Sequence, residues 1–222
     1  MEEPLRISKL LSQRGICSRR DADVFLERGW VLVDGVRAQV GEKVLPTQRV
    51  ELAPEAMATL ARDVTILIHK PLGIVSGQAE DGYQNAASLV TPEHRWIRDP
   101  SGVPWHPAHG EGLAPAGRLD IDSTGLLVLT QDGTVARELI DGSGRIDKEY
   151  LVRYAGVLSP HGLKMLNHGL QLDRRELRPA IVTEQSPDTL KFILREGRKR
   201  QIRRMCELVG PVSYTHLTLP TI

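Results

Sequence analysis

The chain has 222 residues, of which 41% are hydrophobic and 26% are charged, and its formal net charge is +1. These values are ordinary for a globular protein of one or two domains. No apolar run is long enough to cross a bilayer, and residues 1–10 lack the apolar core of a signal peptide, so we expect no membrane segment. Cys17 and Cys206 lie outside any metal-ligand spacing and are typical of buried thiols in a reducing compartment, so we expect a cytoplasmic protein.

Basic residues are concentrated in two stretches of this nearly neutral chain. The N-terminal basic segment, residues 6–20, has five basic residues and no acidic one. The C-terminal basic segment, residues 191–204, has seven basic residues and a single glutamate. Each segment is typical either of a phosphate-binding surface or of a solvated helix face, and neither segment alone decides between the two.

Residues 1–52 predict a small unit that starts with two helices. The apolar spacing indicates a first helix that stops near Gly15 and a second helix that ends at Gly29. Ser18 is expected to cap the second helix, because Asp21 follows three residues later and completes a variant of the capping box.

Three short strands and a linker are predicted to follow. Asp34-Gly35 lies between two β-prone runs, and Asp-Gly is a strong signal for a two-residue hairpin turn. A third strand at 49–52 would complete the unit. Pro54 and the weak periodicity of residues 53–63 indicate a linker or a short connecting helix.

Strands outnumber helices in the rest of the chain. Strands are expected at 64–69, 125–130, 149–153, 180–183 and 190–194, and helices at 134–140, after Ser159-Pro160 and at 198–208. Because strands and helices do not alternate regularly, we expect an α+β fold with a mixed, mainly antiparallel sheet and not a doubly wound parallel sheet. Residues 78–115 are polar and rich in Pro and Gly, which predicts a surface insertion.

A candidate reactive loop precedes the strand expected at 125–130. It runs Gly117-Arg-Leu-Asp-Ile-Asp-Ser-Thr-Gly125. Arg118 lies two residues from Asp120, and a nearby guanidinium keeps a carboxylate ionised, as a nucleophile requires. Most aspartates in such loops only cap a turn, so spacing alone leaves both interpretations open.

The second candidate cluster is the helix expected at 198–208. Arg200, Arg203 and Arg204 would share one broad helix face, with Ile202, Met205 and Leu208-Val209 buried on the opposite side. Such arginines bind phosphate or carboxylate groups, but a solvated basic helix is equally compatible with the pattern. A third feature, Tyr150 near the start of a strand, is by itself as typical of a core or rim residue.

We expect no metal site and no nucleotide cofactor. His106, His109 and Glu111 are potential metal ligands, but Pro107 prevents their regular presentation on a helix and neither cysteine is near. No Gly-rich phosphate loop follows a strand.

Five motifs occur in a fixed order along the chain. They are Gly15–Arg20 with Val33-Asp-Gly35, His69-Lys-Pro-Leu-Gly73, Gly117-Arg-Leu-Asp120 with Thr124-Gly-Leu-Leu127 and Leu129–Gly133, Lys148-Glu-Tyr150, and Gly197–Cys206. Together they resemble the RsuA-type family of pseudouridine synthases, especially its RluF-like members, over residues 5–210. The resemblance implies an α-L type RNA-binding module at 1–52, a linker at 53–63 and a pseudouridine synthase catalytic domain at 64–210.

The resemblance also implies roles for single residues. Asp120 would be the catalytic nucleophile, Tyr150 would stack on the target base, and Arg203 would pair with the aspartate. Arg118 would contact the RNA backbone near the flipped nucleotide. Arg14, Arg19 and Arg20 are expected to bind phosphate because they lie near a helix start, and Arg200 is a further expected contact with RNA.

The implied reaction breaks the glycosidic bond of a uridine, rotates the detached uracil and joins it again through its C5. Asp120 would either attack the nucleotide or assist removal of a sugar proton, and the target base must first be flipped out of folded RNA. No metal and no organic cofactor is required. The expected substrate is 23S ribosomal RNA, with a transfer RNA as the alternative, and the protein is expected to be a monomer without a membrane partner.

Two other classes of protein are compatible with parts of the sequence. One is an RNA-binding protein without catalysis. The other is a glycoside hydrolase that uses Asp120 and Asp122 as paired carboxylates, which share a face on an extended strand. The intact set of Asp120, Tyr150 and Arg203 favours catalysis over the first class. An aromatic content of 4% disfavours the second, because sugar sites usually contain aromatic platforms.

Residues 211–222 depart from the family pattern. The tail contains no Lys or Arg, and its Pro220 would break a central strand, where family members continue with a strand rich in basic residues. We hypothesise that the natural sequence ends near Gly210 and that the remainder is a truncation or sequencing artefact. The alternative is a divergent but genuine terminal strand.

Overall fold

The computed structural model describes residues 3–79, 81–140, 146–210 and 217–218. The chain divides into two compact units. Unit 1 comprises residues 1–66, 90–116 and 128–139, and unit 2 comprises residues 67–89, 117–127 and 140–222. Two strands, β6 (Thr65–Lys70) and β8 (Ser123–Thr130), run from one unit into the other. The units are defined by packing, and the functional boundaries expected at residues 52, 63 and 210 stay a prediction.

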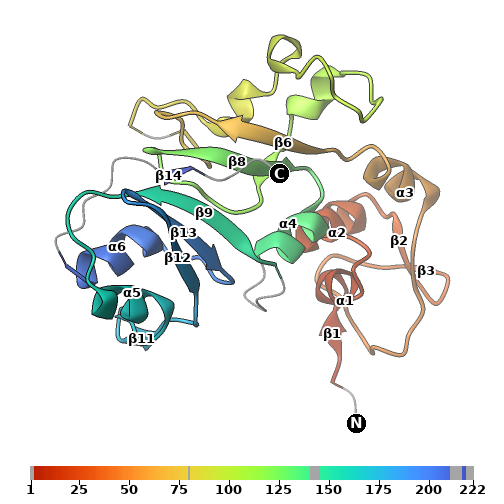
Figure 1. Ribbon diagram of the computed structural model, residues 1–222. Helices are drawn as coiled ribbons and strands as arrows, with labels where there is room; N and C mark the ends of the chain where they lie inside the picture. The colour runs from red at the N-terminus through yellow and green to blue at the C-terminus, as the bar shows by residue number, and fades with distance from the viewer. Residues whose placement is uncertain (1–2, 80, 141–145, 211–216, 219–222) are drawn as a thin grey trace. The chain divides into compact units, whose positions relative to one another are not determined.

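Unit 1 begins with the two predicted helices, α1 (Ile7–Gln13) and α2 (Arg19–Glu27) (Figure 1). A glycine with positive φ follows each of them. The Oγ of Ser18 accepts a hydrogen bond from the Asp21 N–H at 3.1 Å, and the Asp21 carboxylate accepts one from the Ser18 N–H at 3.1 Å. Both helices and the capping box are therefore confirmed.

Short strands complete the N-terminal part of unit 1. They are β1 (Leu5–Arg6), β2 (Val31–Val33), β3 (Val36–Arg37), β4 (Lys43–Val44) and β5 (Val50–Leu52). The order β3-β2-β5 confirms the predicted hairpin and third strand, and β1 pairs separately with β4. The pair β1–β4 was not predicted, because two-residue strands carry no periodicity.

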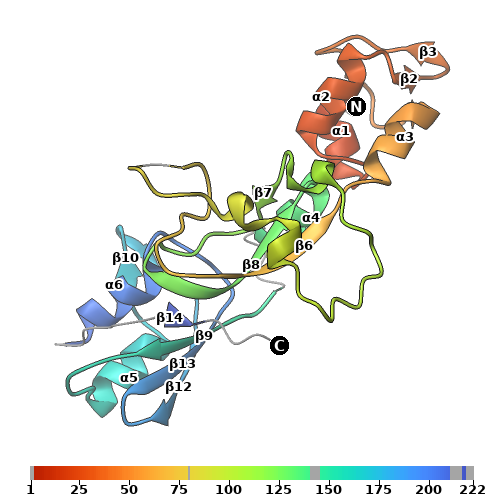
Figure 2. The ribbon, with the colours of Figure 1, turned by 90° about the horizontal axis from the view of Figure 1, so that it is seen from above.

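The predicted linker contains a helix, α3 (Pro54–Leu60), which begins with proline in its first turn. Figure 2 shows α1, α2 and α3 grouped beside β2 and β3. Their common core is apolar, and it includes Ile7, Leu11, Ala22, Phe25, Val31 and Ala56.

The predicted insertion at 78–115 contains three short 3₁₀ helices, Ala86–Leu89, Pro92–His94 and Pro107–Gly110, and the strand β7 (Ala114–Pro115). The Gln131 side chain, just after β8, donates hydrogen bonds to the carbonyl oxygens of Ala108 at 2.7 Å and Glu111 at 2.8 Å. This part of the insertion is therefore tied to the end of β8.

Helix α4 (Gly133–Ile140) packs against the N-terminal helices within unit 1. Arg137 donates to the carbonyl oxygen of Ser12 at 2.5 Å and to its Oγ at 3.0 Å. A side chain at Gly133 would clash with Ser18. The N-terminal module thus makes close, specific contacts with the segment that follows β8.

The sheet in unit 2 contains β9 (Lys148–Arg153), β12 (Ile181–Ser186), β13 (Thr189–Leu194) and the start of β8. Strands β12, β13 and β9 are antiparallel neighbours. The expectation of an α+β fold with a mainly antiparallel sheet is confirmed.

Two helices, α5 (Pro160–Asn167) and α6 (Gln201–Leu208), lie on the same side of β12, β13 and β9 (Figures 1 and 2). The core between helices and sheet includes Val152, Leu166, Leu190, Phe192, Met205 and Cys206. The hairpin of β10 (Gln171–Leu172) and β11 (Arg175–Glu176) follows α5.

The helix predicted at 198–208 starts later than expected. Arg200 has φ 52° and ψ 32°, the left-handed conformation, so α6 begins at Gln201. Arg200 therefore does not share a helix face with Arg203 and Arg204, and this prediction is wrong. Leu208 is 51% exposed, so its predicted burial is also wrong.

The hypothesis about the C-terminal tail falls mostly on residues outside the described ones, since only β14 (Leu217–Thr218) of residues 211–222 is described. β14 is parallel to β8 and antiparallel to β9, and it lies between them in the sheet. The proposed origin of the tail stays a hypothesis.

Both thiols are buried, as predicted. Burial, followed by the negative charges of Asp21 and Asp132, raises the pKa of the Cys17 thiol to about 12. Across the described residues, no helix combines the length and apolar character that crossing a membrane requires.

Candidate active site

The loop that leads into β8 carries Asp120 and is held by the segment after β6. The Ser76 hydroxyl donates to the Leu119 carbonyl oxygen at 2.7 Å and accepts the Leu119 N–H at 2.9 Å. The Gly73 N–H donates to the carbonyl oxygen of Ile121 at 2.9 Å. The backbone is therefore fixed by hydrogen bonds on both sides of Asp120. These bonds join the loop of Asp120 to the segment that contains and follows the motif His69-Lys-Pro-Leu-Gly73.

Two aspartates of this loop face the same two arginines. Asp120 Oδ2 lies 3.6 Å from Arg203 Nε and 3.9 Å from Arg200 Nη1. Asp122 Oδ1 lies 2.8 Å from Arg203 Nη2, and its Oδ2 lies 3.9 Å from Arg200 Nη1. At 3.6 Å the Asp120 contact with Arg203 is an ion pair and not a hydrogen bond. Asp122 is thus the closer ion-pair partner of the Arg203 guanidinium, and Asp120 is the more distant one.

Arg203 lies in the first turn of α6, and its side chain is only 8% exposed. Ile202, Met205 and Cys206 bury the same helix in the core of unit 2 and so fix its position. A buried guanidinium is tolerated only when carboxylates or other acceptors face it. The interpretation of this helix as a solvated basic face is therefore wrong for Arg203.

Tyr150 lies in β9, opposite Phe192 of β13, and packs half-buried against the core of unit 2. Burial, and then the charge of Asp120, raises the pKa of the Tyr150 phenol. The ring is therefore neutral at physiological pH, and it lies within electrostatic reach of Asp120.

Lys70 belongs to the same neighbourhood, although no role was predicted for it. Its side chain is completely buried at the end of β6, and its Nζ donates to the carbonyl oxygens of Pro71 and Ile74 at 2.8 Å each. Burial lowers the pKa of Lys70, while the charges of Asp122 and Asp120 oppose that shift. The available sequence signal was its place in the motif His69-Lys-Pro-Leu-Gly73.

The other predicted RNA contacts are not part of this cluster. Arg118 is exposed two residues before Asp120. Arg19 and Arg20 are exposed in the first turn of α2. Arg14 is also exposed, and its guanidinium donates to the carbonyl oxygens of Pro46 at 2.7 Å and Gln48 at 3.3 Å.

The histidines considered as metal ligands bond to the backbone instead. His106 Nδ1 accepts the Ala108 N–H at 3.1 Å, and His109 Nδ1 accepts the His106 N–H at 3.2 Å. Within the described part of the chain, no three His, Cys, Asp or Glu side chains form a group able to hold a metal ion.

The fold defines the class of protein. The structure resembles the crystal structure of a pseudouridylate synthase with a TM-score of 0.62 and 19% sequence identity, over 96% of this chain and 86% of the other. At this identity the likeness shows the fold, which is that of a pseudouridylate synthase.

The sequence defines the family. The sequence model of the RNA pseudouridylate synthase family matches residues 64–208, which include Asp120, Tyr150 and Arg203. This chain belongs to that family, and the predicted resemblance is confirmed.

Two relatives show how far the similarity extends. The dual-specificity RNA pseudouridine synthase RluF of Salmonella typhi is 31% identical over 207 residues, which are 92% of this chain and 66% of the relative. The ribosomal large subunit pseudouridine synthase B of Bacillus subtilis is 29% identical over 212 residues, which are 92% of this chain and 80% of the relative. The chain thus spans just under two thirds of the length of the RluF relative.

Proposed function

We propose that this protein is an RNA pseudouridine synthase that isomerises a specific uridine in 23S ribosomal RNA. The observation that carries the proposal is the placement of Asp120 beside the buried Arg203, with the neutral phenol of Tyr150 within electrostatic reach. The Bacillus subtilis relative, named a ribosomal large subunit pseudouridine synthase, supports the choice of RNA.

The reaction breaks the bond between C1′ and N1 of the uridine and forms a bond between C1′ and C5. C5 loses a proton and N1 gains one, so the composition of the nucleotide does not change. Asp120 either attacks the nucleotide as a nucleophile or accepts a proton from the sugar, and both routes require its carboxylate close to C1′.

The neighbours of Asp120 hold the reacting groups in place. Arg203 orients the carboxylate through the ion pair with Asp120, and Asp122 in turn contacts Arg203 at 2.8 Å. Tyr150 offers an aromatic face for the detached uracil, and such stacking contributes roughly 1–3 kcal/mol per base. No metal and no organic cofactor takes part in this scheme.

We assign RNA binding to the module at 1–52, joined by residues 53–63 to the catalytic residues at 64–210. Arg14, Arg19 and Arg20 contact phosphates through the module, and Arg118 and Arg200 contact the backbone near the flipped nucleotide. Arg14 also stabilises its own module through the carbonyls of Pro46 and Gln48. We further propose that the protein works as a monomer in the cytoplasm.

Carbodiimide labelling followed by primer extension tests the function directly, because it marks pseudouridines in any RNA. We expect one stop in 23S ribosomal RNA that disappears in a strain without the gene and returns when the gene is restored. A stop that changes only in a transfer RNA would support the alternative substrate. A purified protein that binds ribosomal RNA but forms no pseudouridine in any RNA would instead support the non-catalytic alternative.

A further inference from the structure

The hairpin of β10 and β11 has an unusual turn. Leu172 pairs with Arg175, so the turn consists of two residues, Asp173 and Arg174. Both have positive φ, 55° and 60°. A two-residue turn with two positive φ angles matches the twist of a hairpin, but its second position strongly favours glycine.

The same chain contains the matching turn with glycine. The β2–β3 hairpin turns through Asp34 and Gly35, with φ of 49° and 83°. Since Arg174 occupies the position of Gly35 in an equivalent turn, it adopts a conformation that disfavours a side chain. Backbone strain of this kind is typically retained where the side chain has a function.

The Asp173-Arg174 turn is held firmly by the loop before α6 and by α6 itself. The Arg198 guanidinium donates to the carbonyl oxygens of Leu172 at 3.0 Å and Glu176 at 2.8 Å. Arg204 forms a bidentate ion pair with the Asp173 carboxylate: its Nη2 donates to Oδ1 at 2.6 Å and its Nη1 donates to Oδ2 at 3.0 Å. Arg204 therefore neutralises the exposed carboxylate of Asp173, and Arg174 lies next to it in a turn held by hydrogen bonds.

This support is continuous with the candidate active site. Arg198 and Arg204 hold the hairpin, and Arg200 and Arg203, which lie between them in the chain, contact Asp120. All of these residues belong to unit 2.

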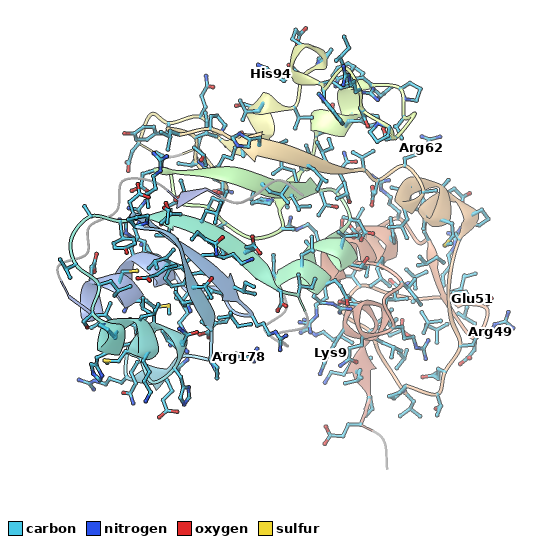
Figure 3. All side chains as sticks on the ribbon, in the orientation of Figure 1. Lys9, Arg49, Glu51, Arg62, His94 and Arg178 are labelled. Carbon is cyan, nitrogen blue, oxygen red and sulfur yellow. The ribbon has the colours of Figure 1, made fainter. Side chains whose placement is uncertain are left out.

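The chain around the turn exposes more basic than acidic side chains: Arg174, Arg175 and Arg178 (labelled in Figure 3) against Asp173 and Glu176, and Asp173 is paired with Arg204. Lys199 and Arg200, which are also exposed, follow Arg198, which holds the hairpin. Among the described residues no ion pair is formed by Arg174. Exposed guanidinium groups on a rigid support are suited to the phosphates of a nucleic acid.

We propose that the Asp173-Arg174 turn contacts the phosphate backbone of the RNA beside the active site, with Arg174 as the contacting residue. The proposal rests on the proposed function, because it takes the RNA of the uridine isomerisation as the ligand. It assigns the strained turn to RNA binding and not to the chemical step.

The test is Arg174→Gly, measured with large-subunit ribosomal RNA transcribed in vitro. We expect the Kd to rise about 5-fold at 0.1 M salt and the slope of log K against log salt to shrink by about one. The melting temperature should stay unchanged or rise, because glycine suits the turn, and single-turnover conversion at saturating protein should be unchanged. Arg174→Lys should keep the salt slope. Lys164→Gln, which removes an exposed charge from α5, is the matched control and should change neither Kd nor slope.

An Arg174→Gly variant with wild-type Kd and slope would overturn the proposal, as would an equal loss in Lys164→Gln. A wild-type protein that forms no pseudouridine would contradict the proposed function instead. The two failures are therefore distinguishable.

Discussion

The two basic segments look alike in sequence, but the protein uses their arginines differently. In the N-terminal basic segment, Arg19 and Arg20 are exposed in the first turn of α2. In the C-terminal basic segment, Arg203 is 8% exposed against two aspartates, and Arg204 pairs with Asp173. In the first segment Arg14 bonds to backbone carbonyls, but Arg19 and Arg20 present their charge to solvent. In the second segment Arg203 and Arg204 instead pair with carboxylates of the protein itself.

The difference shows why the density of positive charge is a weak guide to function. A guanidinium binds a phosphate or an internal carboxylate with the same geometry. Which of the two it meets depends on whether the fold brings a carboxylate to it. In unit 2 the loop before β8 supplies two, and in the N-terminal module the first turn of α2 leaves Arg19 and Arg20 exposed to solvent.

The largest expected effect is on the catalytic rate and concerns Asp120, the carboxylate that Arg200 and Arg203 contact. Asp120→Asn should lower the rate of pseudouridine formation on the order of 10⁴-fold, because the amide keeps the shape and loses the charge. Asp122→Asn should lower it only about 10-fold, through looser positioning of Arg203. Single-turnover assays with ribosomal RNA measure both. Equal losses would favour the paired-carboxylate mechanism, and a tenth of the activity retained in Asp120→Asn would refute its catalytic role.

Substitutions of Arg203 test whether its ion pairs with Asp120 and Asp122 stabilise the protein. Arg203→Met should destabilise the protein by about 2 kcal/mol, less than for a fully buried pair, because Asp120 and Asp122 are 28% and 47% exposed. Arg203→Lys should fold nearly as well but lose activity, because one ammonium group cannot reach both carboxylates. Urea unfolding and the uridine assay separate the two effects. Wild-type stability in Arg203→Met would show that the arginine is not buried as described.

The exposed arginines of the first segment should behave in the opposite way. Arg19→Ala with Arg20→Ala should change stability by less than about 0.5 kcal/mol. The salt slope of RNA binding should shrink by about two. Substitution is a sharper test than removal of residues 1–52, because removal would also break the contacts of α4 with Ser12 and Ser18. An unchanged slope would contradict a role of these arginines in RNA binding.

The smallest expected effects are on stability alone and concern the residues that begin α2 and α6. Ser18→Ala should destabilise the protein by about 1 kcal/mol, because it removes the side-chain cap of α2. Arg200→Gly should cost no stability, since α6 has no side-chain cap and Arg200 holds a positive φ that suits glycine. Chemical denaturation of both variants checks the contrast. A clear loss of stability in Arg200→Gly would mean that the ion pairs of Arg200 stabilise the protein by more than its left-handed backbone conformation destabilises it.

Local signals were sufficient for most elements of the fold. Ser18 with Asp21, the Asp34-Gly35 turn and the Ser159-Pro160 helix start all act over a few residues, so the sequence predicts them directly. The strands β1 and β4 were missed because two residues are too short for a pattern. The start of α6 was misplaced because nothing local indicates that Arg200 adopts the left-handed conformation.

The sequence by itself determined the composition of the candidate site, since the motifs around Asp120, Tyr150 and Arg203 are continuous runs of residues. Only the tertiary structure decided how these residues meet. It placed Asp122 and not Asp120 at 2.8 Å from Arg203, buried Lys70 near both carboxylates, and set Arg174 on a turn held by Arg198 and Arg204. The physical reason is that these contacts join residues between 26 and 81 positions apart in the chain. Their distance and burial depend on how sheet and helix pack, and no local propensity determines them.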